Sequence, residues 1–390
     1  MNTADVTSLL ENSERLGHEG VVSELLEAIR RSGISTSEAI QRIDLALSTF
    51  REFWVASGGL DLAILTNLGE SYERLGGLRQ AEALYREVID GTEGSDLATL
   101  RADNYRKLGR LKRRQGQWQE ALEAVQAARE IFEPLGDEVA SARCRQVEGA
   151  IQWSRGDGAA ARASFEYALE IAERRDVASL ILASCMNLGL VDLLSGDYDQ
   201  GAIRFNEALV LAKSIQRAES IARAYHNLGI CYSFKESWQE ALDAYEHSLE
   251  VSERIGLLET AGKSYVQKGH VYLCLKDVTL AATYCAKALD IADEIGRPLG
   301  RANAFRVLGR LIGERGDYIT GMNVLEQGLE IFRQFENPLG EAEIMREIGT
   351  LQLNRDTSDR GNQTLQNALS IFERIGARGE VARTRALLAN

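Results

Sequence analysis

A column of large apolar side chains recurs every 40 residues along the chain. Each leucine of this column is followed two residues later by an isoleucine, a leucine or a valine, and we interpret these positions as the buried face of one recurring helix. The leucines are Leu169, Leu209, Leu249, Leu289, Leu329 and Leu369. The pattern predicts a series of similar helices, one for every 40 residues.

A second column with the same period consists of glycine. Its members are Gly69, Gly109, Gly149, Gly189, Gly229, Gly269, Gly309 and Gly349. A glycine inside a helix costs about 1 kcal/mol relative to alanine, so eight glycines in register require a structural reason. Twelve residues after each glycine comes another Ala or Gly. Because helices whose axes approach within roughly 8 Å have no room for larger side chains, the small residues predict close packing between two helices of one repeat.

Short turns separate the two helices of a repeat. The segment RGDY, Arg315–Tyr318, is one of them. Its glycine suits a tight turn and its aspartate suits the cap of the next helix, so we interpret the tripeptide RGD as a structural element and not as an adhesion motif.

The register defines the organisation of the chain. Residues 59–378 form eight helix-turn-helix repeats, and residues 379–390 restart the first helix of a repeat as a C-terminal cap. Residues 1–58 are helical but out of register, with Ser35 and Glu38 at the spacing of a capping box, and we expect an N-terminal cap with one degenerate repeat. The chain has only 3 prolines and no alternating strand pattern, so the predicted fold class is all-α.

The repeat resembles the tetratricopeptide repeat. The resemblance is carried by Asn227-Leu228-Gly229 in the first helix and by Ala241 and Tyr245 in the second. The repeat of 40 residues departs from the usual length of about 34 and lacks the closing proline, and is more similar to the long repeats of kinesin light chains and bacterial signalling adaptors. The resemblance implies a right-handed α-α superhelical solenoid whose first helices line the concave side.

Composition and charge narrow the set of partners. A formal net charge of −13 argues against nucleic acid, since phosphate binding needs clustered Lys and Arg. No uninterrupted apolar run approaches the length of a membrane span, and the N-terminus lacks the apolar core of a signal peptide. We therefore expect no membrane insertion and a cytoplasmic location. The 5 cysteines show no disulfide or zinc pattern and are expected to be reduced and mostly buried.

The geometry of the family predicts which side chains face the concave groove. They are positively charged in the second repeat, mostly apolar from the third to the sixth, and arginine again in the seventh. The predicted partner-binding residues are Arg106, Lys107, Arg110, Arg113, Arg114, Trp153, Met186, Asn187, Leu190, Leu194, His226, Asn227, Ile230, Phe234, Arg306 and Arg310.

These residues suit an extended peptide or a partner helix with apolar anchors and acidic residues. The side-chain amides of Asn187 and Asn227 can each pair with both sides of a peptide group, and the resemblance implies that they hold the backbone of a ligand. The simpler interpretation is that the arginines form a solvated face and the asparagines bond a neighbouring helix. The apolar residues need a cover, which could be a partner, a second copy of the chain or its own N-terminal segment.

The sequence offers little for a metal or for catalysis. His270 and Cys274 lie four residues apart on one helix and His226 lies on an earlier first helix, but no fourth ligand is evident, and packing explains them better. Phosphate-binding loops, nucleophile elbows and metalloprotease motifs are absent from the sequence. We expect no cofactor, no metal and no enzymatic activity.

Three functions remain. The leading hypothesis is a protein-protein interaction scaffold or adaptor that binds a peptide segment or helix in the concave groove. The alternative is a regulatory solenoid that senses a peptide or effector and controls a partner by changing its superhelical shape, as the resemblance to bacterial pheromone receptors suggests. The third is self-assembly into a homo-oligomer through the convex face or the solenoid ends.

Overall fold

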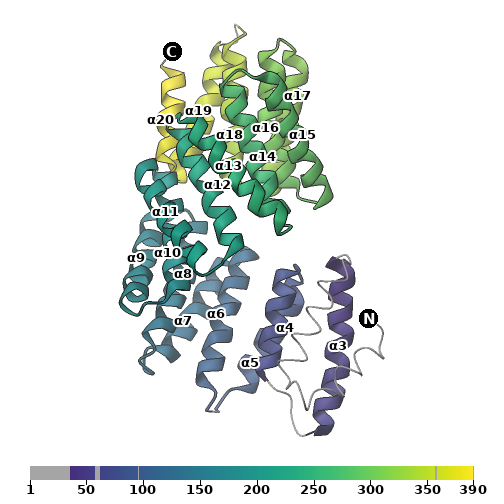
Figure 1. The fold of residues 1–390 in the computed structure, drawn as a ribbon, viewed down its shortest axis with the longest axis vertical. Coiled ribbons are helices and arrows are strands. Elements are labelled where there is room, and N and C mark those ends of the chain that lie inside the picture. Colours follow the sequence, from purple (N-terminus) through teal and green to yellow (C-terminus); the bar gives the residue numbers. More distant parts are fainter. Residues whose placement is uncertain (1–35, 58–61, 95, 356–357, 390) are drawn as a thin grey trace. The chain divides into compact units, whose positions relative to one another are not determined.

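A computed structural model describes residues 36–57, 62–94, 96–355 and 358–389, and all regular secondary structure in these ranges is α-helix (Figure 1). The chain divides into two compact units, Met1–Ser154 and Arg155–Asn390. The described helices of the first unit are α3 (Thr36–Ser57), α4 (Leu62–Arg74), α5 (Leu78–Gly91), α6 (Ala98–Arg114), α7 (Trp118–Phe132) and α8 (Glu138–Ser154).

The second unit continues the same alternation of helices. Its members are α9 (Gly158–Arg174), α10 (Ala178–Ser195), α11 (Tyr198–Ser214), α12 (Ala218–Phe234), α13 (Trp238–Arg254), α14 (Leu258–Cys274), α15 (Val278–Glu294), α16 (Pro298–Glu314), α17 (Tyr318–Gln334), α18 (Pro338–Leu353), α19 (Ser358–Arg374) and α20 (Arg378–Leu388). From α10 to α20 every second helix begins 40 residues after the one before. The predicted all-α repeat solenoid is therefore confirmed, whereas residues 1–35 of the predicted N-terminal cap lie outside the described residues.

The recurring glycine marks the place where the two helices of a repeat touch. A Cβ atom added to Gly229 would lie only 2.4 Å from the ring of Tyr245, and one added to Gly189 only 2.7 Å from the ring of Phe205. Real Cβ atoms do not approach other atoms so closely, so a side chain at either glycine would displace the ring. The glycine therefore accommodates the large residue that stands 16 positions later on the second helix.

The turns between helices have the predicted chemistry. Gly316 adopts a φ of +99°, which favours glycine, and Asp317 accepts a hydrogen bond from the backbone N–H of Thr320 at the start of α17. Asp157 and Asp197 cap α9 and α11 in the same way. The RGD tripeptides are thus turn and cap, as expected.

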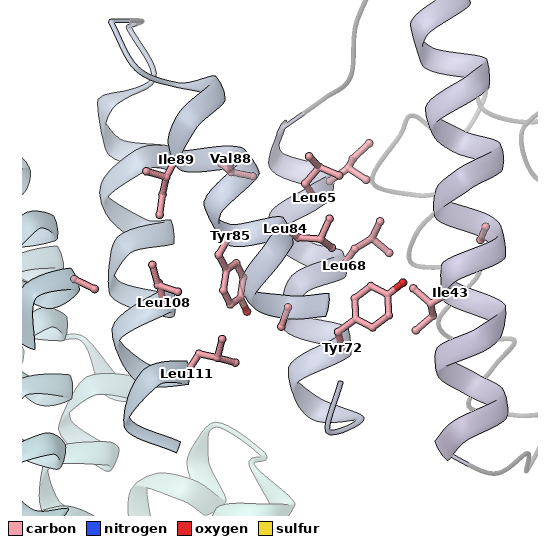
Figure 2. Close-up of a cluster of buried hydrophobic side chains, with 14 of the residues drawn as sticks. Ile43, Leu65, Leu68, Tyr72, Leu84, Tyr85, Val88, Ile89, Leu108 and Leu111 are labelled. Atoms are coloured by element: carbon pink, nitrogen blue, oxygen red, sulfur yellow. The ribbon is translucent and has the colours of Figure 1, made fainter. Parts of the chain in front are cut away.

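The described part of the first unit has an apolar core around α4 and α5 and a second one formed by α6, α7 and α8. Figure 2 shows Tyr72 and Tyr85 within the first core, with Ile43 approaching from α3 and Leu108 and Leu111 from α6. Both tyrosine rings are fully buried. Helix α3 therefore contributes to the same hydrophobic core as the first repeat.

Helix α10 is the most apolar helix of the second unit. Among the described residues it is the one helix long and apolar enough to cross a membrane by length and composition alone, although Asn187 and Asp192 interrupt it. Its environment explains this composition, because α10 contacts α9, α11, α12 and α20. A helix that packs on several sides needs apolar residues around most of its circumference.

The contact between α10 and α20 closes the second unit on itself (Figure 1). Gly196, just after α10, faces the backbone of Gly379 in α20, and a Cβ on Gly379 would lie 2.1 Å from the hydroxyl oxygen of Tyr198. Leu194 packs against an apolar cluster that includes Met345 and Phe372. Helices five repeats apart in the sequence are therefore in direct contact.

Candidate ligand-binding site

A cavity of about 560 Å³ lies within the Arg155–Asn390 unit. Its walls come from α12, α14, α15, α16 and α18, and residues of α10, α11, α17 and α20 complete it. Pockets that hold small ligands usually measure roughly 300–1,000 Å³. The cavity is therefore large enough for a small molecule or a short peptide.

One wall of the cavity is apolar. It contains Leu193 and Leu194 of α10, Ile230 and Phe234 of α12, and Val266 of α14. These side chains offer a surface on which aliphatic or aromatic groups of a ligand would lose contact with water.

The charged side chains of the lining, here called the charged wall, carry an excess of positive charge. Five cationic side chains line the cavity against three carboxylates, although the chain as a whole has a net charge of −13. The cations are Lys263, Arg297, Arg306, Arg346 and Arg383, and the carboxylates are Glu259, Glu343 and Glu380. The cavity therefore favours an anionic ligand.

Two histidines in the lining add no charge. Burial lowers the pKa of His226 to about 3, with a smaller contribution from Lys263. Burial likewise lowers the pKa of His270 to about 3, helped by Arg306. Both imidazoles are neutral at pH 7, so the positive charge of the cavity comes from its arginines and lysine.

Three arginines of the cavity lie close to one another. Burial lowers the pKa of Arg346. The nearby carboxylates of Glu347 and Glu343 raise this pKa in part, whereas the positive charges of Arg306 and Arg383 lower it further. Like charges in a buried cluster are unfavourable unless carboxylates or a bound anion compensate them.

The three arginines differ in how far they are compensated. Arg346 pairs with Glu380, and both side chains are buried. Arg306 is 6% exposed and its Nε lies 3.4 Å from a carboxylate oxygen of Glu343, but it makes no hydrogen bond to a described residue. Arg383 makes neither an ion pair nor a hydrogen bond within the described part of the chain, and lies over the ring of Phe234. Since buried polar groups are nearly always hydrogen-bonded, Arg306 in particular has donors to offer.

Five of the predicted partner-binding residues line the cavity. They are Leu194, His226, Ile230, Phe234 and Arg306. Two others, Met186 and Leu190, pack against the core between α11 and α12, and Arg310 pairs with Glu314 and Glu347.

The two predicted asparagines lie outside the cavity lining. Asn227 is buried and Asn187 is half-buried. Neither side-chain amide makes a hydrogen bond to a described residue, so both retain the donors and acceptors that backbone recognition would use. Their predicted role remains a prediction.

The predicted basic residues of the second repeat lie in the first unit, where acidic side chains face them. Lys107 pairs with Glu70 at 2.8 Å, and Arg110 and Arg114 share Glu73 at 2.7 and 3.2 Å. Burial alone would raise the pKa of Glu73, but its bonds to these two arginines lower it overall. The positive charge of these residues is therefore largely compensated within the unit.

The other two predicted basic residues of the second repeat are Arg106 and Arg113. Arg106 pairs with Asp103 on its own helix. Arg113 donates a hydrogen bond to Ser154 at 3.3 Å, and burial together with Arg114 and Arg110 lowers its pKa. Trp153 is half-buried on α8.

Sequence reasoning missed most of the cavity lining, including the charged residues Arg346, Glu380 and Arg383. Arg346 stands three residues before Gly349, in the same column as His226 and Arg306, so the register alone could have found it. Glu380 and Arg383 carry no such signal, because α20 reaches the cavity only through the closure of the unit.

The structure gives no support to a metal site. No group of three or more His, Cys, Asp or Glu side chains suited to a metal occurs among the described residues. His226 Nδ1 lies 2.9 Å from the hydroxyl of Ser264, and Cys274 Sγ lies 4.0 Å from His270 Nε2. Contacts within the protein account for these side chains.

Family models described as tetratricopeptide repeat match residues 62–93, 99–174, 180–254 and 262–294. These segments make up more than half of the chain, so the protein belongs to the tetratricopeptide repeat family. A search of curated proteins by sequence finds no match.

Several solved structures have a similar fold. A Rap protein complexed with Competence and Sporulation Factor is 14% identical, with 97% of this chain and 100% of that chain covered and a TM-score of 0.66. Aspartyl phosphate phosphatase F from Bacillus subtilis is 11% identical, with coverages of 80% and 95% and a TM-score of 0.62. The apo form of the quorum sensor NprR from B. thuringiensis is 16% identical, with coverages of 90% and 98% and a TM-score of 0.59.

Proposed function

We propose that this protein is a non-enzymatic regulatory protein that binds a short peptide in the cavity of its Arg155–Asn390 unit. The observation that carries the proposal is the cavity itself, which joins an apolar wall to a surplus of two positive charges in an acidic chain. A peptide with an apolar side chain and a carboxylate would complement both walls.

The closure of the unit favours a short ligand over a long partner segment. An open groove can hold an extended segment along its whole length, whereas the contact between α10 and α20 restricts the space around this cavity. Of the functions that the sequence left open, sensing of a small peptide therefore suits the geometry better than a scaffold for long segments.

The similar structures are compatible with this proposal. One is described as a complex with Competence and Sporulation Factor and another as a quorum sensor. At identities of 14% and 16% these structures establish the fold alone, so the ligand class proposed for this chain is based on its own cavity. The five free cysteines, four of them buried, suit the reducing interior of a cell, where we propose that the protein acts.

A selection from short random peptides tests the proposal. Displayed peptides are selected on the full chain, and the enriched sequences are synthesised and titrated by calorimetry. We expect peptides with at least one carboxylate and one large apolar side chain. Enrichment of basic or purely polar peptides, or no enrichment, would contradict the proposal.

A matched pair of variants locates the binding. Gln267 lines the cavity on α14 and makes no hydrogen bond to a described residue, so Gln267→Trp fills the cavity at little cost to the fold. Gln239 is exposed on α13, and Gln239→Trp is the same change on the surface. The cavity variant should bind selected peptides at least roughly ten-fold more weakly, about 1.4 kcal/mol, and the surface variant should bind them normally.

A further inference from the structure

Glu380 occupies the place in the cavity where a ligand carboxylate would bind best. It pairs with Arg346, while Arg306 and Arg383 supply two further guanidinium groups nearby. Carboxylates match the planar fork of an arginine side chain, and such pairs are among the stronger hydrogen-bonded contacts in proteins. The chain therefore already holds one carboxylate in a pocket that has guanidinium donors left over.

Helix α20, which carries Glu380, is held by few apolar contacts. Its buried residues are Glu380 and Thr384, and both are polar. The hydroxyl of Thr384 donates to the backbone oxygen of Glu380 within the same helix, so it contributes nothing to the attachment. The apolar attachment of α20 to α18 is the half-buried Val381, which packs against the cluster that contains Ala342 and Met345. Elements with few buried apolar contacts open at the lowest free energy, and the ion pair of Glu380 with Arg346 is the buried polar link between the two helices.

We propose that Glu380 is an internal competitor for the ligand, and that the carboxylate of a bound peptide replaces it on Arg346 and releases α20 from α18. This inference rests on the proposed function, and it adds the chemical group that is recognised and the helix that responds.

The exchange of carboxylates explains why binding can move a helix at small cost. Removing Glu380 alone would leave Arg346 buried with only the longer contact to Glu347, at 3.7 Å, to compensate its charge, which is unfavourable. When a ligand carboxylate takes its place, Arg346 stays paired, and Glu380 gains hydration as α20 moves away. The ligand then has a higher affinity for the state with α20 released, which is the condition for a shift in population.

The test uses two small probes that differ in one group. N-acetylphenylalanine carries an aromatic ring and a carboxylate, and N-acetylphenylalaninamide has the same ring with a neutral amide. Both are titrated into the full chain and into Glu380→Gln. We expect the wild-type protein to prefer the carboxylate, and Glu380→Gln to increase that preference by roughly five-fold or more, because the competitor has been removed.

A second measurement needs no variant. Hydrogen exchange at the backbone amides of residues 378–388 should become faster when the wild-type protein is saturated with N-acetylphenylalanine, and should not change with the amide probe. Slower exchange in α20 on binding of the carboxylate probe would overturn the inference, since it would mean that the ligand stabilises α20 in its place.

The control removes a different carboxylate beside the same helix. Glu373 of α19 pairs on the surface with Arg385 of α20 at 2.6 Å, so Glu373→Gln loosens α20 without vacating Arg346. This variant should leave the preference for the carboxylate unchanged. An equal effect of both variants, or no effect of Glu380→Gln, would overturn the inference even if selected peptides bind in the cavity. If neither the selected peptides nor the probes bind, both this inference and the proposed function are wrong.

Discussion

The guanidinium of Arg383 lies over the ring of Phe234, with its central carbon 4.1 Å from the ring centroid. Phe234 is in turn stacked on Tyr198, with 4.6 Å between the ring centroids. The three side chains come from α20, α12 and α11, and all of them line the cavity. This stack is where the apolar wall and the charged wall meet.

The contact between Arg383 and Phe234 should be measurable as a coupling energy. A cation over an aromatic ring contributes about 0.5–1 kcal/mol at exposed sites and more when desolvated. A double-mutant cycle with Arg383→Gln and Phe234→Leu should therefore show a coupling of at least about 0.5 kcal/mol in the free energy of unfolding. Arg378 is exposed on the same helix, and a cycle with Arg378→Gln should show none. Equal couplings in the two cycles would mean that Arg383 has no specific interaction with the ring of Phe234.

Replacing the arginine of the buried Arg346–Glu380 pair should lower the stability of the protein. In Arg346→Met, the carboxylates of Glu380 and Glu347 lose a partner in a buried place, and we expect a loss of roughly 3 kcal/mol or more. The double variant Arg346→Met/Glu380→Met should recover part of this loss, because one unpaired charge is gone. Chemical denaturation monitored by circular dichroism compares them, and a double variant less stable than Arg346→Met would contradict the expectation.

The glycine column predicts a position-dependent effect of alanine. In Gly229→Ala the new methyl group meets the ring of Tyr245, and we expect a loss of about 1–3 kcal/mol as the ring is displaced. Gly158, at the start of α9, has no atom within 4 Å of an added Cβ and no positive φ. Gly158→Ala should be neutral or slightly stabilising, and thermal melting of both variants separates packing from helix propensity.

Acid should destabilise the cavity through its histidines. The pKa values of His226 and His270 fall from 6.5 to about 3 on folding, so the unfolded chain binds more protons between these values. Their contribution to stability is complete above about pH 6.5 and is lost as the pH falls toward 3, by up to about 1.4 kcal/mol per pH unit for each histidine.

Variants assign this dependence to the two side chains. His226→Gln and His270→Gln should each reduce the slope of the free energy of unfolding between pH 6.5 and 4, measured by denaturation at several pH values. His247 is exposed on α13, and His247→Gln should keep the slope of the wild-type protein. A slope that survives both buried substitutions would show that other groups cause it.

The fold could be predicted from the sequence because one period of 40 residues runs through it without interruption. Gly229 and its equivalents identified the contact between the helices of a repeat, and Asp317 identified a helix cap. Such local relations recur in each repeat, so every copy strengthens the same conclusion. The bulky partner of the glycine, Tyr245, could be understood only from the structure, because its contact depends on the angle between the helices.

The cavity could be predicted only in part, since it depends on relations between repeats. Phe234 and Arg306 were found because they lie in columns that the geometry of the family predicts to face the concave side, and both line the cavity. Glu380 and Arg383 were missed, because the small rotation from one repeat to the next accumulates until α20 meets α10, and no single repeat contains that information. In the first unit the sequence pattern identified the arginines but not their ion-pair partner Glu73, which lies on the first helix of the preceding repeat.

The contact between α10 and α20 also changes how the second unit should unfold. In an open array each repeat touches only its neighbours, so the end repeats fray first and the stability is close to a sum of nearest-neighbour terms. Here α20 is joined to a helix that lies five repeats earlier. Loosening α20 therefore exposes the flank of α10 at the same time, and the two ends of the unit should melt as one cooperative block ahead of the repeats between them.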